Sequence, residues 1–287
     1  MTDLDTVTTA IDRLKRDIAK ASYTLSKDEA RFLVDAYYMM QDNRIRSAAQ
    51  VRSLSASEEP HAVLAWLEDQ SDTLEKQIKR ALDYYSVASI QGQWLKAQIG
   101  IGPVIAAGML AHLDVTRAKT SGGFWRFAGL DSTVKWEKGK KRPWNASLKR
   151  LCWLLGESFV KTSGNENSIY GKMYVERKAR EIEFNEAGRY AEQAAQVLAS
   201  RKIGKDTIAY AHYAQGKLPP AHIHARAKRW AVKMFLSHFH AICYFMAYGR
   251  LAPQPYVIAI LAHDPGHYVP PPMVELIPGM EQHINEH

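Results

Sequence analysis

The stretch Trp94-Leu-Lys-Ala-Gln-Ile-Gly-Ile-Gly-Pro-Val-Ile-Ala-Ala-Gly-Met-Leu110 is the most distinctive part of this sequence. Its first residues predict a short helix that ends at Gly100-Ile-Gly102, where glycine permits a positive φ and a close approach of backbone to another group. Pro103 is the residue type favoured at the first position of a new helix. The pattern predicts a helix-hairpin-helix whose turn could bind a phosphate of a nucleic-acid backbone. The alternative is a helix–helix turn that is buried in the core.

A basic segment follows the expected hairpin: Lys135-Trp-Glu-Lys-Gly-Lys-Lys-Arg-Pro-Trp144. Its cations outnumber the single Glu137, and the tryptophans at either end offer surfaces on which bases could stack. The sequence that follows reads as a helix over Asn145–Leu155 with cations in its first turns. The alternative is a solvated basic turn. We therefore expect a nucleic-acid-binding surface made of Gly100, Gly102, Lys135, Trp136, Lys138, Lys140, Lys141, Arg142, Trp144, Lys149 and Arg150.

Three elements occur in a distinctive order: Ile99-Gly-Ile-Gly-Pro-Val-Ile-Ala-Ala107, Phe127-Ala-Gly-Leu130, and a Gly-Lys-Lys-Arg segment that leads to Asn145 and Leu148-Lys-Arg150. Over roughly residues 90–160 the chain resembles the C-terminal domain of one insertion-sequence transposase family. Members of that family pair a four-acid, RNase-H-like N-terminal domain with a helix-hairpin-helix domain that carries a catalytic serine, and they work with a bridging guide RNA. The resemblance implies a DNA-binding fold, with RNA as another partner.

The sequence departs from the family where the chemistry would be. In the family the serine stands in a Ser-Gly pair shortly after the Ala-Gly-Leu element, whereas here that place holds Glu137 or Lys138. The N-terminal third also lacks the apolar strand ending in Asp that begins an RNase-H-like fold. No catalytic residue is therefore assigned. Ser132 and Ser147 are the nearby hydroxyl groups that remain to be tested as nucleophiles.

Helical patterns occupy the rest of the chain. A capping box at Ser26-Lys-Asp-Glu29 predicts the start of one helix. Leu74, Ile78, Leu82 and Tyr85 form a stripe that could pack against a neighbouring helix of the chain, or against a second copy in a homo-oligomer formed by the N-terminal helices. Further helices are expected from Gly171 to about Ser200 and from Ala221 to Tyr248. After Gly249 the chain becomes rich in proline, which favours an extended tail over the surface.

These patterns predict a mostly α, multi-helix protein with a central helix-hairpin-helix and an extended, proline-rich C-terminal tail. We expect an N-terminal helical region at 1–92, a nucleic-acid-binding region at 93–160, a C-terminal helical region at 161–250 and a proline- and histidine-rich tail at 251–287. Alternating strand patterns and internal repeats are not found.

Composition and charge narrow the class of protein. The 287 residues are 46% hydrophobic and 24% charged, which is typical of a globular chain and excludes disordered, collagenous and membrane classes. Two cysteines are too few for a disulfide framework or a zinc site. With no signal peptide and no long apolar run, we expect a cytoplasmic protein without a membrane association. The net charge is +8, and because residues 96–287 carry all of the excess positive charge, a polyanion is the expected partner.

The histidines cluster near the C-terminus but do not predict a metal site. His238 and His240 would point about 200° apart on a helix, and His263-Asp-Pro-Gly-His267 is a loop that could fold around a cation. We expect no metal and no cofactor, since the sequence contains no nucleotide-phosphate motif Gly-x-x-x-x-Gly-Lys, no dinucleotide-binding motif and no Cys-x-x-Cys motif.

Three functional hypotheses follow. The first is a DNA-binding protein of transposase or recombination type, from a mobile genetic element, that binds the phosphate backbone without the serine chemistry of the family. The second is an active transposase or recombinase with a hydroxyl nucleophile placed elsewhere. The third is a protein-interaction module that only keeps the fold.

Overall fold

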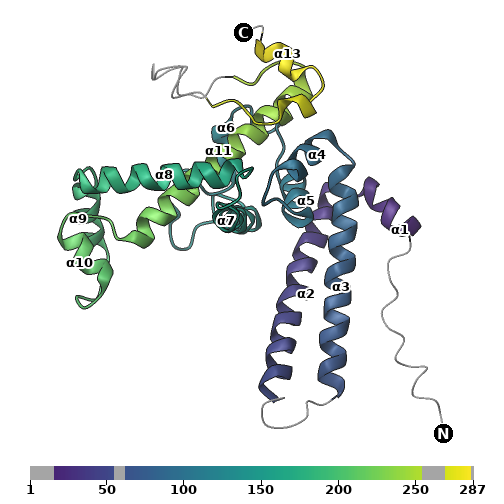
Figure 1. The fold of residues 1–287 in the computed structure, drawn as a ribbon, viewed down its shortest axis with the longest axis horizontal. Helices are drawn as coiled ribbons and strands as arrows, with labels where there is room; N and C mark the ends of the chain where they lie inside the picture. The colour runs from purple at the N-terminus through teal and green to yellow at the C-terminus, as the bar shows by residue number, and fades with distance from the viewer. Residues whose placement is uncertain (1–15, 55–61, 254–268, 286–287) are drawn as a thin grey trace. The chain divides into compact units, whose positions relative to one another are not determined.

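The computed structural model describes residues 16–54, 62–253 and 269–285, and these form helices joined by turns (Figure 1). No strand occurs in these ranges, so the prediction of a mostly α, multi-helix protein is confirmed. The chain divides into two compact units. The first runs to Ala97 and includes Ile101–Asp114, and the second contains Gln98–Gly100 and continues from Val115. The expected region 93–160 is thus shared between two units, which differs from the four regions expected from the sequence.

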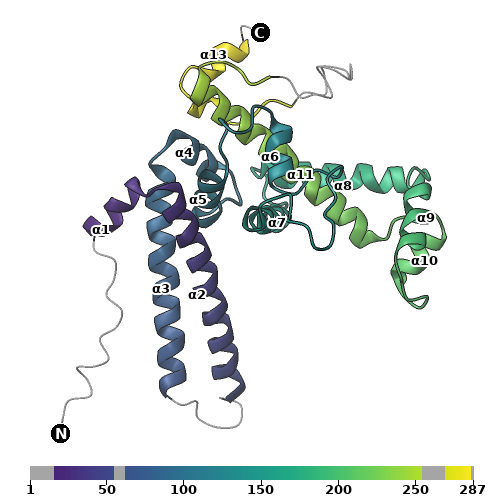
Figure 2. The same cartoon turned by 180° about the vertical axis from the view of Figure 1, so that it is seen from behind.

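The first unit contains a short entry segment, a long helical pair and a helical hairpin. Its elements are α1 (Arg16–Ala21), the 3-10 turn η2 (Ser22–Thr24), α2 (Lys27–Leu54), α3 (Ala62–Val87), α4 (Ile90–Ala97) and α5 (Pro103–His112). In both views α2 and α3 lie side by side and antiparallel (Figures 1 and 2). The capping box is confirmed: Glu29 N–H donates to Ser26 Oγ at 3.2 Å, and Ser26 N–H donates to Glu29 Oε2 at 2.8 Å.

Helical spacing explains why α2 and α3 pair. Ala30, Val34 and Tyr37 are buried at i, i+4 and i+7 on α2, which places them on one face. On α3 the expected stripe is largely covered within the chain, because Leu82 is fully buried and its neighbours on the stripe are half-buried. Further along the pair, the contact between the helices becomes polar.

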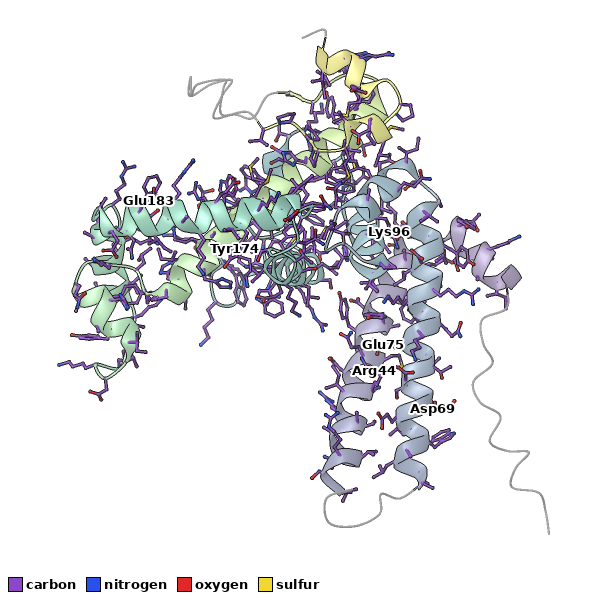
Figure 3. All side chains as sticks on the ribbon, viewed as in Figure 1. Arg44, Asp69, Glu75, Lys96, Tyr174 and Glu183 are labelled. Atoms are coloured by element: carbon purple, nitrogen blue, oxygen red, sulfur yellow. The ribbon has the colours of Figure 1, made fainter. Side chains whose placement is uncertain are left out.

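The polar contact of the long pair centres on Glu75 of α3, which is 8% exposed. Arg44 of α2 lies beside it (Figure 3) and donates from Nε to Glu75 Oε2 at 2.6 Å. Gln41 Nε2 donates to Glu75 Oε1 at 3.3 Å. Burial raises the pKa of Glu75, but hydrogen bonds from Arg44 and Tyr37 outweigh burial and the net shift of this pKa is downward. The carboxylate is therefore charged and paired.

The helix-hairpin-helix is present as α4 and α5, which pack against each other. Pro103 is the first residue of α5, as expected. Ala106, Ala107 and Gly108 are buried, so the small residues of α5 do permit close packing.

The second unit contains α6 (Ser121–Phe127), α7 (Ala146–Lys161), α8 (Ile169–Glu186), α9 (Ala191–Ser200), α10 (Ile208–Ala214) and α11 (Pro220–Tyr248). The helix expected from Gly171 to about Ser200 is therefore wrong, because it is two helices. The break lies at Gly188, whose φ of 74° is left-handed. The helix expected from Ala221 to Tyr248 is confirmed with one additional residue.

Helix α11 carries the core of the second unit. Phe235, Phe239 and His238 are buried on it, and the ring of Phe235 packs edge-on against Phe159 of α7 and Tyr170 of α8. None of the helices in the described ranges, α11 included, combines the length and the apolar character that crossing a membrane requires.

His238 and His240 make separate contacts on different sides of α11. His238 Nε2 donates to the Val269 carbonyl at 3.0 Å, so its Nδ1 accepts from the Tyr170 hydroxyl at 3.0 Å. His240 Nε2 donates to the Ala118 carbonyl at 2.9 Å. Burial lowers the pKa of His238 to about 4, which leaves the ring neutral at pH 7. Both rings act as neutral polar groups of the core.

The described end of the tail is more structured than an extended chain. It forms the 3-10 turn η4 (Val274–Leu276) and α13 (Met280–Asn285), and Ile277 and Met280 are buried. The middle of the tail, 254–268, which includes the His263–His267 loop, lies outside the described residues.

Candidate nucleic-acid interface

Gly100 is fixed by packing within the second unit. Its φ is 95°, a value that favours glycine. Ser158 Oγ of α7 donates to the Gly100 carbonyl at 2.6 Å. A Cβ at this position would lie 3.1 Å from Ser158 Oγ and 3.2 Å from Thr162 Oγ1. The expected positive φ is confirmed here, and one polar group of the turn is already used inside the protein.

Gly102 behaves differently. Its φ of −87° and ψ of 174° are extended backbone, so the expected positive φ is wrong at this position. The residue caps α5, is exposed, and has no atom within 4 Å of where a Cβ would stand. The backbone at Gly102 is therefore open to an approaching group, but its geometry does not require glycine.

The basic segment is an ordered loop that begins after α6. The Trp136 indole N–H donates to the Lys140 carbonyl at 2.8 Å, and the Arg142 guanidinium lies 5.0 Å from the centre of the Trp136 ring. Such a cation–π contact holds a cation in place while leaving it charged. Trp136 thus closes the loop and positions Arg142.

Trp144 likewise positions a cation, in the first turns of α7. The Lys149 ammonium lies 4.1 Å from the centre of the Trp144 ring. Asn145 caps the helix, since its side-chain oxygen accepts from Leu148 N–H at 2.8 Å. Both tryptophans therefore have a cation against the ring, and neither is simply a free surface for a base.

The remaining cations of the loop face solvent. Lys135, Lys138, Lys140 and Lys141 are exposed, and no ion pair within the described residues involves them. Arg150 is exposed on α7.

Lys149 connects the loop with a further cation that was not included among the expected site residues. Burial lowers the pKa of Lys149, and the neighbouring charges of Arg142 and Arg229 lower it further. Arg229 belongs to α11. The fold therefore brings cations of the loop, α7 and α11 into one positive surface.

The two predicted halves of the interface do not form one continuous site on α7. Gly100 contacts Ser158, near the C-terminal end of the helix, whereas the loop contacts its N-terminal end. Lys149 and Ser158 are separated along the helix axis by about 14 Å at 1.5 Å per residue.

A cavity of about 390 Å³ lies beside α11, and little in the sequence indicates it. Arg226, Arg229 and Lys233 line it from α11, at i, i+3 and i+7 on one helix face, as their spacing indicates. On the facing helix α8, Glu181 is 1% exposed. The mixed charges around it predict a solvated helix, and for Glu181 that interpretation is wrong.

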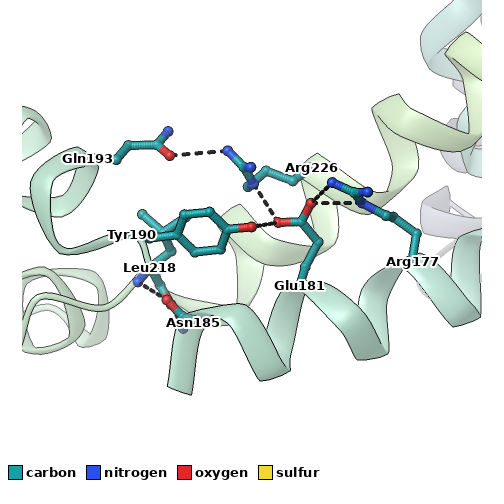
Figure 4. A network of polar contacts seen from close by, with 7 residues as sticks. All are labelled: Arg177, Glu181, Asn185, Tyr190, Gln193, Leu218 and Arg226. Carbon is teal, nitrogen blue, oxygen red and sulfur yellow. Dashed lines mark hydrogen bonds and ion pairs between the residues drawn. The ribbon is translucent and has the colours of Figure 1, made fainter. Parts of the chain in front are cut away.

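Glu181 is held by two arginines and a tyrosine (Figure 4). Arg177 donates to Oε1 at 2.6 Å, Arg226 Nε donates to Oε2 at 2.7 Å, and the Tyr190 hydroxyl donates to Oε2 at 2.5 Å. Burial raises the pKa of Glu181, but these hydrogen bonds outweigh burial and lower it. The sequence signal for the burial of Glu181 is its place on one face of α8, where the other buried residues include Tyr170, Tyr174 and Asn185.

Comparison of the chain with protein-family models, with curated proteins and with solved structures gave no match in any of the three. The residues and their geometry are therefore the basis for assigning a function.

Proposed function

We propose that this protein binds nucleic acid, with DNA as its principal partner and the phosphate backbone as its main contact. The interface consists of the loop Lys135–Trp144, the first turns of α7 and the adjacent cations of α11. The observation that carries the proposal is the exposed set of loop cations without ion-pair partners in the described residues, next to Arg142 and Lys149, which tryptophans hold in place.

The physical reason is electrostatic. A cation that is already paired with a carboxylate gains little from a phosphate, whereas an unpaired cation attracts one and releases condensed counterions from the nucleic acid. Cations held in position by aromatic rings also lose less conformational freedom on binding. Such contacts position a strand and do not read its sequence.

The test changes Lys138, Lys140, Lys141 and Arg142 together to alanine. Binding of a fluorescent DNA duplex, and of an RNA duplex, is measured by anisotropy at several salt concentrations. We expect weaker binding and a salt slope that falls by about 0.9 for each duplex phosphate that the variant no longer neutralises. The loss of affinity should be similar for unrelated sequences.

A matched variant separates local contacts from total charge. Lys172, Arg180, Lys202 and Lys205 are exposed cations outside the proposed interface, and changing them to alanine removes the same charge. We expect a much smaller change in slope for this control. Equal slopes for the loop variant and the unmodified protein, with melting temperatures unchanged, would rule out the loop as the interface.

A second candidate function is strand transfer through a hydroxyl group. Ser132 lines the cavity beside α11, together with Arg229 and Lys233, and these cations could stabilise a phosphoryl group. Ser147 does not line this cavity. Attack by Ser132 would form a phosphoester with the strand and release a hydroxyl end. A covalent protein–DNA adduct that survives denaturation, and that Ser132→Ala abolishes, would identify this function.

A further inference from the structure

The cavity beside α11 has more positive than negative charge. Four cations line it, Arg177 and Arg226 near Glu181, and Arg229 and Lys233 beyond them. The carboxylates in the lining are those of Glu181 and Asp131. Counting one charge for each group leaves two positive charges in excess.

The two carboxylates accept hydrogen bonds from other groups, and the charge of Asp131 also acts on Lys233 without an ion pair between them. Glu181 accepts from both of its arginines. Asp131 Oδ1 accepts from Thr133, at 2.9 Å from the backbone N–H and at 2.7 Å from the hydroxyl. Among the ion pairs of the described residues, none includes Arg229 or Lys233. These two cations are the ones available to a ligand.

Lys233 is held in place by Trp125. The Lys233 ammonium lies 5.1 Å from the centre of the Trp125 ring, and the Trp125 indole N–H donates to the Lys233 carbonyl at 3.0 Å. Burial lowers the pKa of Lys233, and burial together with the charge of Arg226 lowers the pKa of Arg229. Lys233 is half-buried and Arg229 is exposed. Like charges four residues apart on a helix repel each other, and an anion bound by both would compensate for this repulsion.

The walls of the cavity are organised before any ligand arrives. Arg226 is fixed at one end by Glu181 and at the other by Gln193, whose side-chain oxygen accepts from Arg226 Nη1 at 3.1 Å (Figure 4). Trp230 and Leu130 add apolar surface to the lining. The volume of about 390 Å³ falls near the lower end of the range of small-ligand sites, about 300–1,000 Å³.

We propose that this cavity is a phosphate-binding site in which Arg229 and Lys233 contact the phosphate oxygens, while the Arg177–Glu181–Arg226 network forms its fixed wall. A guanidinium fork and an ammonium suit a tetrahedral anion that carries up to two charges. The phosphate could belong to a nucleic-acid strand or to a free phosphorylated molecule. The site itself does not depend on the nucleic-acid function proposed above.

The experiment titrates the full chain with sodium pyrophosphate in a calorimeter at constant ionic strength. We expect saturable binding to one site. The double variant Arg229→Gln/Lys233→Gln should weaken it about tenfold or more, since it removes two charge-assisted hydrogen bonds. Arg229→Gln alone should give an intermediate loss, and it serves if the double variant does not fold. Arg180→Gln, an exposed cation of α8, is the control and should leave affinity unchanged.

A second arm identifies the source of the phosphate. Binding of a DNA duplex and of a single strand is compared for the double variant and the unmodified protein. Loss of both pyrophosphate and DNA affinity supports a strand phosphate as ligand, and loss of pyrophosphate affinity alone supports a free phosphorylated molecule. If the unmodified protein binds pyrophosphate but not DNA, the nucleic-acid function is refuted and the proposed phosphate site in the cavity is supported. The absence of saturable pyrophosphate binding, or equal affinity in the folded double variant, would overturn the proposed site.

Discussion

Each unit of the molecule contains a carboxylate buried between two helices and held by arginine and tyrosine. In the first unit it is Glu75, bonded by Arg44 and close to Tyr37. In the second it is Glu181, bonded by Arg177, Arg226 and Tyr190. The same three residue types therefore occur in both, but the surrounding charges differ.

Around Glu75 the charges balance. Arg44 also lies 3.9 Å from Asp72, and Lys76 pairs with Asp72 at 2.6 Å, so two cations face two carboxylates. Around Glu181 cations are in excess, because two guanidiniums hold one carboxylate and Arg229 and Lys233 line the same cavity. A buried ion pair by itself joins two helices, and it leaves positive charge for an anion only where cations are in excess.

The largest expected effect comes from removing each carboxylate. Glu181→Ala leaves two partly buried guanidiniums without a partner and should lower the free energy of unfolding by about 4 kcal/mol. Glu75→Ala leaves one, which is more exposed, and should cost about 2 kcal/mol. Urea unfolding followed by circular dichroism measures both.

Glu183→Ala is the matched control for Glu181, because Glu183 is exposed on the same helix (Figure 3). Its effect should stay within about 0.5 kcal/mol. Equal losses for Glu75→Ala and Glu181→Ala would show that the second arginine adds nothing to the network.

Acid should destabilise the second unit before it affects either carboxylate. Because the folded pKa of His238, about 4, lies below the ordinary value of 6.5, the unfolded chain binds the proton more tightly. Stability is therefore lost as pH falls from about 6.5 to 4, by about 3 kcal/mol from this group. The lowered pKa values of Glu75 and Glu181 place their losses below their ordinary value of 4.5.

Unfolding in urea at pH 7, 5.5 and 4 measures this dependence. His238→Gln should flatten the part between pH 6.5 and 4 while leaving the acid limb below it. His240, whose pKa burial also lowers, contributes in the same direction. A profile that is already flat above pH 4.5 in the unmodified protein would show that His238 is not a buried neutral group.

The hairpin turn tests whether nucleic-acid contacts are confined to the second unit. Gly100→Val should lower stability by about 2 kcal/mol, since its left-handed φ is strained for valine. Gly102→Val should leave the melting temperature unchanged, because its backbone is extended and the space is open. If the turn contacts a strand, the added side chain should raise the Kd about tenfold, equivalent to about 1.4 kcal/mol. An unchanged Kd for folded Gly102→Val would make the hairpin structural only.

The helices that could be predicted from the sequence are those with a local signal. The capping box at Ser26–Glu29 identified the start of one helix, and the long pattern that ends before Gly249 identified another nearly to the residue. The break at Gly188 was missed because alanine and glutamate on both sides favour helix. The buried role of Glu181 was missed because partners from α9 and α11, distant in sequence, determine whether a charged residue is solvated or paired.

The candidate site could also be predicted only where the signal is local in sequence. The loop cations were identified from their density alone, and the structure confirms that they are exposed. The spacing of Arg226, Arg229 and Lys233 predicts one helix face that could extend this surface. The proximity of Arg229 to Lys149 could not be predicted, because it depends on how α7 and α11 pack. Likewise, the packed position of Gly100 depends on Ser158, which lies on another helix.

The smallest expected effect tests the charge balance directly. Asp131 of the cavity and Asp72 of the first unit are both partly exposed carboxylates, so they form a matched pair. Asp131→Asn removes a negative charge that acts on Lys233 while its side-chain oxygen can still accept from Thr133. Pyrophosphate affinity should therefore rise about two- to threefold, the size expected for a weakly screened surface charge. Asp72→Asn removes the same charge from the first unit and should leave pyrophosphate affinity unchanged. Equal responses to the two substitutions would mean that only total charge matters, and that the cations in excess beside Glu181 do not form a distinct site.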